Sequence, residues 1–155
     1  MSKTNAIRIL EASGIIFSTH EYEVDENDLT GETVAKKINA EADAVFKTLV
    51  ARNEVNELFV FCIPVTTELN LKKAAKASGS KSIALIHVKE LLPLTGYIRG
   101  GCSPVGMKKK FPTFLDETAQ LFETIFVSAG VRGMQISLSP SNLQKITESA
   151  FSDLI

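Results

Sequence analysis

The sequence predicts an α+β fold, a single domain over residues 1–155 in which short helices surround a curved, mixed and partly barrel-like β-sheet. The first observation is irregular interleaving, because segments rich in β-branched and aromatic residues alternate with short amphipathic segments in no fixed order. The second is size, since 155 residues with 45% hydrophobic content suffice for one compact core. The third is continuity: no internal repeat, low-complexity tract or long linker divides the chain. A doubly wound nucleotide-binding fold is therefore not expected.

Helices are predicted where a capping residue precedes an apolar stripe. Thr4 can cap a helix that ends at Ser13 before Gly14, and Thr30-Gly31 opens a second short helix after an acidic loop. Residues 88–92 should form only one helical turn, because Pro93 lacks the N–H that a continuing helix needs. Further helices are expected at 70–78, around 119–120 and from Ser139-Pro140 onward.

Strands are predicted where β-branched and aromatic residues cluster between polar turns. Residues 44–51 are apolar on both faces of the alternating pattern, which is typical of a central strand. A polar turn at 53–57 should pair this strand with the next one in a hairpin. The predicted strands are 15–22, 44–51, 58–65, 83–86, 113–115, 124–128 and 134–138.

Lys47 is a cation inside this central strand, on the same face as Val45 and Leu49. A lysine among hydrophobic residues can extend to the surface, pair with a buried carboxylate or line a pocket. The sequence leaves these three arrangements open. Only the last of them makes the ammonium group available to a ligand.

Residues 95–110 read as a shaped loop, since they contain four of the nine glycines, a proline and three consecutive lysines. Backbone N–H groups around Gly100-Gly101, just before Ser103-Pro104, could cradle an anion or a developing oxyanion. The alternative is a tight turn between two strands with no functional role.

The basic residues are concentrated in the middle of the chain. Residues 70–110 contain nine Lys and Arg but a single Glu, whereas the whole chain has 17 Lys and Arg against 18 Asp and Glu. This distribution predicts a basic face suited to a polyanion, unless folding intermixes the charges. The lysines singled out for that face are Lys72, Lys73, Lys76, Lys108, Lys109 and Lys110.

Several kinds of chemistry find no support in the sequence. Neither a P-loop nor a dinucleotide fingerprint is present, and His20 and His87 have no partners that suggest a catalytic triad. Cys62 and Cys102 form no disulfide framework or zinc-site spacing, and Cys102 lacks an identifiable base that would make it a nucleophile. No metal or cofactor is expected. Without a signal segment or an apolar run of ~20 residues, a cytoplasmic protein with no membrane partner is expected.

Five motifs, in order and nearly end to end, resemble the YbaK/EbsC-type aminoacyl-tRNA deacylases. These are freestanding relatives of the editing domain inserted in bacterial prolyl-tRNA synthetases. The motifs are Phe-Lys-Thr-Leu at 46–49, Leu-Lys-Lys-Ala-Ala-Lys at 71–76, Thr-Gly-Tyr at 95–97, Gly-Gly-Cys-Ser-Pro at 100–104 with Gly106 and Lys108-Lys109, and Val-Ser-Ala-Gly-Val-Arg-Gly at 127–133.

The resemblance implies hydrolysis of the ester that joins a misattached amino acid to tRNA, most often cysteine on proline tRNA. It implies that Lys47 holds the 3′-terminal adenosine and that the Gly101 N–H faces the scissile carbonyl. The substrate's own thiol would then expel the tRNA as a cyclic thiolactone. The implied partners are mischarged tRNA(Pro), held through the six lysines, and prolyl-tRNA synthetase. The implied substrate-binding residues are Tyr22, Thr30, Gly100, Cys102, Ser103, Pro104 and Ser128.

Three positions depart from the family pattern. Thr30 stands where the best-known relatives carry an aromatic residue, Cys102 occupies a site that is usually aliphatic, and Val131 replaces a common lysine. Two alternatives to cysteine editing therefore remain: a preference for another small amino acid such as alanine, or a non-catalytic module that binds tRNA ends or nucleotides.

Overall fold

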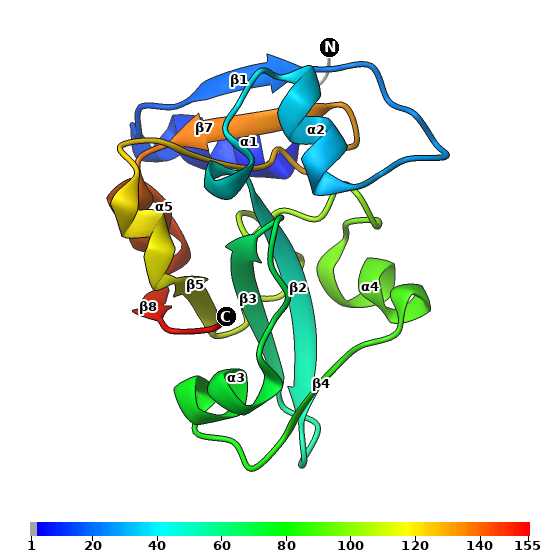
Figure 1. Ribbon diagram of the computed structural model, residues 1–155, viewed down its shortest axis with the longest axis vertical. Helices are drawn as coiled ribbons and strands as arrows, with labels where there is room; N and C mark the ends of the chain where they lie inside the picture. The colour runs from blue at the N-terminus through cyan, green and yellow to red at the C-terminus, as the bar shows by residue number, and fades with distance from the viewer. Residues whose placement is uncertain (1–2) are drawn as a thin grey trace.

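The computed structural model describes residues 3–155 and has two open β-sheets with helices around them (Figure 1). The three-stranded sheet is antiparallel, in the order β1 (Ser18–Glu21), β7 (Met134–Leu138), β6 (Ile125–Ser128). The five-stranded sheet is mixed, because β3–β5 and β5–β8 are parallel. Its order is β4 (Ile83–Leu85), β2 (Phe46–Asn53), β3 (Leu58–Pro64), β5 (Thr113–Asp116), β8 (Ala150–Ser152).

The predicted α+β class and mixed pairing are confirmed, but the partly barrel-like closure is not observed. Among the described residues, one isolated bridge from Val45 to Phe126 is the only β-pairing between the two sheets. A single bridge cannot continue the hydrogen-bond ladder from one sheet into the other, so both sheets stay open.

Five α-helices surround the sheets, together with two 3₁₀ turns. Caps predicted from the sequence are present, because the Thr4, Asn70 and Ser139 side chains each accept a hydrogen bond from the first turn of a helix. The helices are α1 (Asn5–Ser13), α2 (Gly31–Lys37), α3 (Leu71–Ser78), α4 (Val88–Thr95) and α5 (Pro140–Thr147), and the 3₁₀ turns are η1 (Ala42–Ala44) and η2 (Glu117–Leu121). No helix in residues 3–155 combines the length and apolar composition that spanning a membrane requires.

Three elements differ clearly from the prediction: α4, β1 and β8. Helix α4 continues through Pro93 to Thr95: the Thr95 hydroxyl donates to the Leu91 carbonyl and the Gly96 N–H closes the helix on Leu92, although Pro93 leaves the Lys89 carbonyl without its usual donor. The strand expected at 15–22 is shorter, since only β1 pairs with β7. Strand β8 was not predicted, because three residues that pair with β5 leave too short a pattern to recognise.

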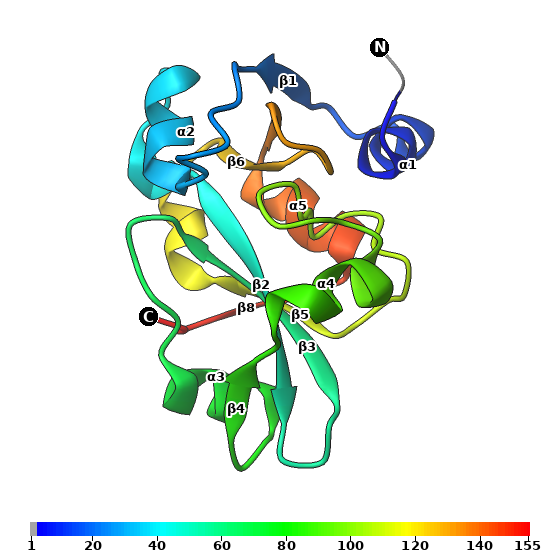
Figure 2. The same cartoon turned by 90° about the vertical axis from the view of Figure 1, so that its right-hand side faces the viewer.

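Strand β2 is central, as predicted, and hydrophobic clusters cover both of its faces. Phe46 and Val50 pack into the larger cluster with α1, β6, β7 and α5, while Ala51 belongs to a second cluster with α3 and Leu154. Figure 2 shows α3 and β4 at one end of the molecule and α2 and β1 at the other, with β2 running between them. This packing holds Lys47 and its neighbours at a fixed place.

Candidate active site

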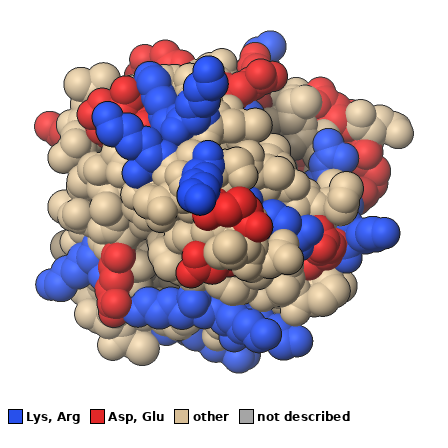
Figure 3. All heavy atoms as spheres, turned by 90° about the horizontal axis from the view of Figure 1, so that it is seen from below, with Lys and Arg blue, Asp and Glu red and all other residues tan. Residues whose placement is uncertain are grey.

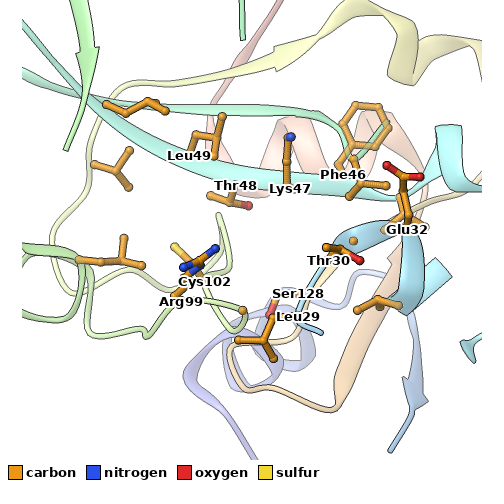
Figure 4. A pocket seen from close by; sticks show the side chains of 18 of the residues that line it. Leu29, Thr30, Glu32, Phe46, Lys47, Thr48, Leu49, Arg99, Cys102 and Ser128 are labelled. Atoms are coloured by element: carbon orange, nitrogen blue, oxygen red, sulfur yellow. The ribbon is translucent and has the colours of Figure 1, made fainter. Parts of the chain in front are cut away.

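A cavity of about 840 Å³ opens beside β2, where that strand lacks a neighbour on one side. Strand β4 pairs only with residues 51–53, and Ile86 N–H makes one further bond to the Val50 carbonyl. Residues 46–49 consequently form part of the cavity wall (Figure 4). The rest of the wall comes mainly from the start of α2, residues 65–68, the segment between β4 and α4, and Ser128 and Gln135 of the smaller sheet. The glycine-rich loop contributes Arg99, Gly100 and Cys102, whereas Gly101 is not part of the lining.

Lys47 lines this cavity, and its ammonium group makes no ion pair or hydrogen bond with any of residues 3–155. Pairing with a buried carboxylate, one of the three arrangements considered above, is therefore excluded within the described chain. Lys47 lies opposite Ile63, whereas Thr48 lies opposite Cys62, so alternation places Lys47 and Thr48 on different faces of β2. Figure 4 accordingly shows the Lys47 side chain directed away from Cys102 and Ser128.

The glycine-rich segment is a closed loop rather than a tight turn. Its ends meet where Lys108 N–H donates to the Thr95 carbonyl at 2.8 Å. The Tyr97 side chain links the two halves of the loop, because its hydroxyl donates to the Val105 carbonyl at 2.7 Å and lies 3.1 Å from the Gly106 carbonyl. Burial raises the pKa of Tyr97 to about 12, so the hydroxyl remains a donor throughout the physiological range.

Gly101 is the point where this loop meets the second glycine turn, residues 129–133 between β6 and β7. A Cβ atom on Gly101 would lie 3.1 Å from backbone atoms of Val131 and Arg132, closer than packed side chains normally approach. The Arg132 Nε also donates to the Arg99 carbonyl at 2.8 Å. The Gly101 N–H itself donates to the Ile98 carbonyl at 2.9 Å, whereas the Cys102 N–H has no acceptor among residues 3–155.

Cys102 contributes its thiol to the cavity wall but remains protonated. Burial raises the pKa of Cys102 to about 12, against which the hydrogen bond from Thr95 acts only weakly. Cys62 lies on the neighbouring strand β3 and, being fully buried, also has its pKa raised to about 12. Neither cysteine is therefore a thiolate near neutral pH, and this favours a packing role for Cys102 over a nucleophilic one.

The other predicted substrate-binding residues divide into two groups. Thr30, Gly100 and Ser128 line the cavity, and Thr30 also caps α2 while its hydroxyl donates to the Asp28 carboxylate at 2.8 Å. Residues outside the lining are Tyr22, Ser103 and Pro104: Tyr22 is half-buried and bonded through its N–H to Gly133, and the other two are buried inside the loop.

Sequence reasoning did not single out several residues that line the cavity. Gln135 is the most informative of them, because its side-chain oxygen is buried and has no hydrogen-bond partner among residues 3–155. The only signal available was its place in a short strand directly after the second glycine turn. The charged residues and the histidine among them are Glu32, Glu68, His87 and Arg99, and all four are exposed. No group of three or more potential metal ligands occurs in residues 3–155.

The six lysines assigned to a basic face do not line this cavity. Lys73 pairs with Asp153 at 3.0 Å and Lys110 with Glu148 at 2.7 Å, so folding neutralises part of the predicted patch. Lys109 and Lys110 border a separate, smaller hollow. Seen from the end of the molecule where α3 lies, Lys and Arg gather in more than one group, with Asp and Glu among them (Figure 3).

A family model identifies the class of protein to which this fold belongs. The sequence model of the aminoacyl-tRNA editing domain matches residues 25–146, most of the chain, and the chain therefore belongs to that family. The matched region includes both glycine turns and the residues Lys47, Cys102, Ser128 and Gln135 of the cavity wall. The family predicted from motif order is confirmed.

Two proteins and one solved structure are similar to this chain over different lengths. An Enterococcus faecalis protein named "Putative Cys-tRNA(Pro)/Cys-tRNA(Cys) deacylase EbsC" is 46% identical over 152 residues, which cover 98% of this chain and 93% of that protein. A proline–tRNA ligase of Brachyspira hyodysenteriae is 29% identical over 83 residues, 54% of this chain but only 14% of the ligase. A crystal structure described as "a putative trans-editing enzyme for prolyl tRNA synthetase" has a TM-score of 0.84 and 25% identity, covering 99% of this chain and 98% of that one.

Proposed function

We propose that this protein is a trans-editing aminoacyl-tRNA deacylase and that its main substrate is Cys-tRNA(Pro). The observation that carries the proposal is a cavity, in an editing-domain fold, where an unpaired lysine lies on one wall and a glycine-rich loop on another. The name of the E. faecalis relative supports cysteine as the amino acid and proline tRNA as the carrier. The prolyl-tRNA synthetase partner rests on the similarity to the ligase and to the trans-editing structure.

Lys47 would bind the nucleotide end of the substrate. Its ammonium group has no competing carboxylate within the described chain, so a phosphate or ribose oxygen of the terminal adenosine can become its partner. The side chain is directed away from the loop at 99–102. We therefore assign Lys47 to holding the adenosine and not to stabilising charge on the carbonyl oxygen.

The chemical step would use the thiol of the substrate. The substrate sulfur attacks the ester carbonyl, the bond from that carbon to the ribose oxygen breaks, and the thiol proton ends on the ribose hydroxyl. The products are a cyclic thiolactone and free tRNA. Proximity within one small molecule supplies much of the acceleration, so the protein needs to supply geometry and hydrogen-bond donors.

A backbone N–H of the glycine loop would stabilise the oxyanion that forms during this step. Gly101 would have to release the Ile98 carbonyl before its N–H could serve, whereas the Cys102 N–H is already without an acceptor among residues 3–155. We assign the Cys102 N–H as the donor, with Gly100 and Gly101 allowing the close approach of the substrate.

A panel of mischarged tRNAs tests the substrate and the mechanism together. We expect Cys-tRNA(Pro) to be hydrolysed at least tenfold faster than Ala-tRNA(Pro) and 2-aminobutyryl-tRNA(Pro), the latter having a methyl group in place of the thiol. Equal rates on the sulfur-free esters would exclude thiol assistance and leave a deacylase for small amino acids, which the Thr30 position also permits. Adding prolyl-tRNA synthetase to the same assay tests the partner.

The variant Lys47→Ala separates an enzyme from a tRNA-binding module. Loss of one positioning contact at a reacting centre typically lowers turnover by about 10²-fold or more, so we expect that loss for Lys47→Ala in single-turnover deacylation. Lys145→Ala in α5 makes the same change of charge away from the cavity and should leave turnover unchanged. Absence of hydrolysis by the unaltered protein, with tRNA binding retained, would instead identify a binding module.

A further inference from the structure

Gln135 has an unsatisfied polar atom in the wall of the cavity. The residue is only 6% exposed, it lines the cavity, and its Oε1 accepts no hydrogen bond from residues 3–155. Buried side-chain oxygens in proteins almost always have a donor, and an exception calls for a physical reason. A ligand that brings an N–H group to this wall would supply one.

The neighbours of Gln135 in the sheet do not provide the donor. Register places Gln135 beside His20 on β1 and Ser128 on β6, so the three residues form a polar row across the smaller sheet. His20 Nε2 is hydrogen-bonded to the Ser137 hydroxyl at 2.8 Å, and the Ser128 hydroxyl accepts from Gly130 N–H at 3.2 Å. Neither neighbour donates to the Gln135 side-chain oxygen, which therefore keeps its capacity to accept a hydrogen bond from a molecule in the cavity.

The other face of the same strand explains why Gln135 cannot turn away. Met134 and Ile136 alternate with Gln135 along β7 and are buried in the larger hydrophobic cluster. Moving the carboxamide to that side would place a polar group among apolar side chains. The strand therefore fixes the carboxamide on the cavity side.

We propose that the Gln135 carboxamide oxygen accepts a hydrogen bond from the α-ammonium group of the bound aminoacyl ester. The inference rests on the proposed function, because it takes an aminoacyl ester as the occupant of the cavity. The α-ammonium is the strong donor next to the scissile carbonyl, whereas a thiol is a weak one. Because glutamine does not titrate, the acceptor is the same at every pH at which the protein is folded.

Because the Gln135 side chain is buried, this contact also affects which substrates can bind. An ester whose α-nitrogen is acylated, as at the end of a peptidyl-tRNA, has one N–H, no charge and additional bulk at this buried wall. Gln135 would therefore select free aminoacyl esters and spare N-blocked ones. This is a specificity role for a residue that touches the substrate without joining the bond changes.

Two non-hydrolysable compounds isolate the contact. The first is 3′-deoxyadenosine that carries cysteine in amide linkage at the 3′-nitrogen, and the second is its 3-mercaptopropionyl counterpart, which lacks only the α-amino group. We expect the unaltered protein to bind the amine compound about 10- to 100-fold more tightly by calorimetry, the usual effect of a hydrogen bond to a charged group. In Gln135→Leu the two dissociation constants should become equal while that of the des-amino compound stays unchanged.

A matched control and a second variant make the outcome interpretable. Gln120→Leu makes the same chemical change on the exposed surface of η2 and should keep the preference of the unaltered protein. If Gln135→Leu fails to fold, Gln135→Glu retains the shape of the side chain and should increase the preference for the amine compound. A preference that survives in Gln135→Leu, or fails to increase in Gln135→Glu, would overturn the assignment.

The same measurements distinguish this inference from the proposed function. Hydrolysis of Cys-tRNA(Pro) without any preference between the two compounds would refute the role of Gln135 and leave the deacylase intact. A preference that depends on Gln135 in a protein without hydrolytic activity would support the contact and refute the enzyme. Failure of the unaltered protein to bind either compound at millimolar concentration would overturn both.

Discussion

At the scale of single residues, the surroundings of each functional group decide its chemistry. Cys102 was a conceivable nucleophile because glycine N–H groups and lysines are close in sequence. In the folded chain, burial outweighs those influences and raises the pKa of Cys102 to about 12. For Lys47, in contrast, the fold leaves the functional group available to a ligand. This cation of an apolar strand lines a cavity and has no carboxylate partner among the described residues.

The protonation state of Cys102 leads to a prediction at this scale. The thiol remains neutral between pH 6 and 9, because its pKa is raised to about 12, so it should contribute no inflection to the pH–rate profile in that range. Cys102→Val should keep kcat/KM within about tenfold of the parent, since volume-conserving changes of buried side chains cost little. Loss of a true nucleophile would cost roughly 10⁴-fold or more.

The control for that measurement is Cys62→Val, which alters a second buried cysteine that does not line the cavity. Both variants should retain activity on Cys-tRNA(Pro) to a similar extent. A collapse of activity in Cys102→Val alone, with unchanged thermal stability, would show that the enzyme's own thiol takes part in the reaction.

At the scale of elements, two glycine turns from distant parts of the chain build one side of the cavity. The loop at 95–108 is closed by Thr95 and Lys108 and is braced inside by the Tyr97 hydroxyl. The turn after β6 packs against it at Gly101, where an added Cβ atom would lie only 3.1 Å from the backbone of Val131. Their contact sets the position of the Cys102 N–H, which we assign to the oxyanion.

Gly101→Ala tests this contact between the two turns. The added methyl group would lie 3.1 Å from backbone atoms of Val131 and Arg132, which must move by a few tenths of an ångström. Overpacking of this kind costs about 1–3 kcal/mol, so urea denaturation should show a lower free energy of unfolding. Single-turnover hydrolysis should fall as well, because the loop at 99–102 shifts with it.

Gly79→Ala is the comparison variant for the glycine experiment. Gly79 ends α3 with φ of +68° and nothing within 4 Å of an added Cβ, so alanine there introduces backbone strain without a clash. We expect a loss of about 1 kcal/mol in stability and full activity. Equal activity of the two variants would mean that the packing of the turns does not position catalytic groups.

At the scale of the whole molecule, charge is distributed less simply than along the chain. The central basic segment forms α3, α4 and the 95–110 loop, and carboxylates from other segments pair with its Lys73 and Lys110. Such exposed pairs contribute little to stability, but they reduce the number of cations that remain free for phosphates. Among the described residues, Lys72, Lys76, Lys108 and Lys109 have no carboxylate within 4 Å.

The free lysines predict how tRNA binding depends on salt. Each cation that contacts a phosphate adds about 0.9 to the slope of log K against log[salt] on a duplex. Lys76→Ala should therefore lower the slope by about one and weaken binding, measured by filter binding between 50 and 200 mM salt. Lys3→Ala removes the same charge near α1, at the end of the molecule away from α3, and should leave the slope unchanged.

A slope that does not differ between Lys76→Ala and the unaltered protein would show that α3 lies outside the tRNA interface. In that case the phosphate contacts must come from Lys47, Arg99 and the 108–110 run. The basic face would then be local to the mouth of the cavity and the adjoining loop.

Short-range patterns in the sequence determined the elements of this protein. Caps at Thr4, Asn70 and Ser139, the apolar alternation around Lys47 and the glycine-rich loop all act within a few residues, so their structures could be predicted. The ordered motifs also identified the family. The helix was expected to end before Pro93, but α4 continues to Thr95 and is closed by bonds that lie beyond the proline, at Thr95 and Gly96.

Only the tertiary structure decided which residues share the cavity and in what state. The register of β7 between β1 and β6 places Gln135 on the cavity wall, and burial holds Cys102 protonated. The Gly101 N–H is bonded to Ile98, and Tyr22 lies outside the lining. These outcomes depend on contacts between segments that are far apart in the chain, since desolvation and strand register are properties of the packed molecule and not of local sequence.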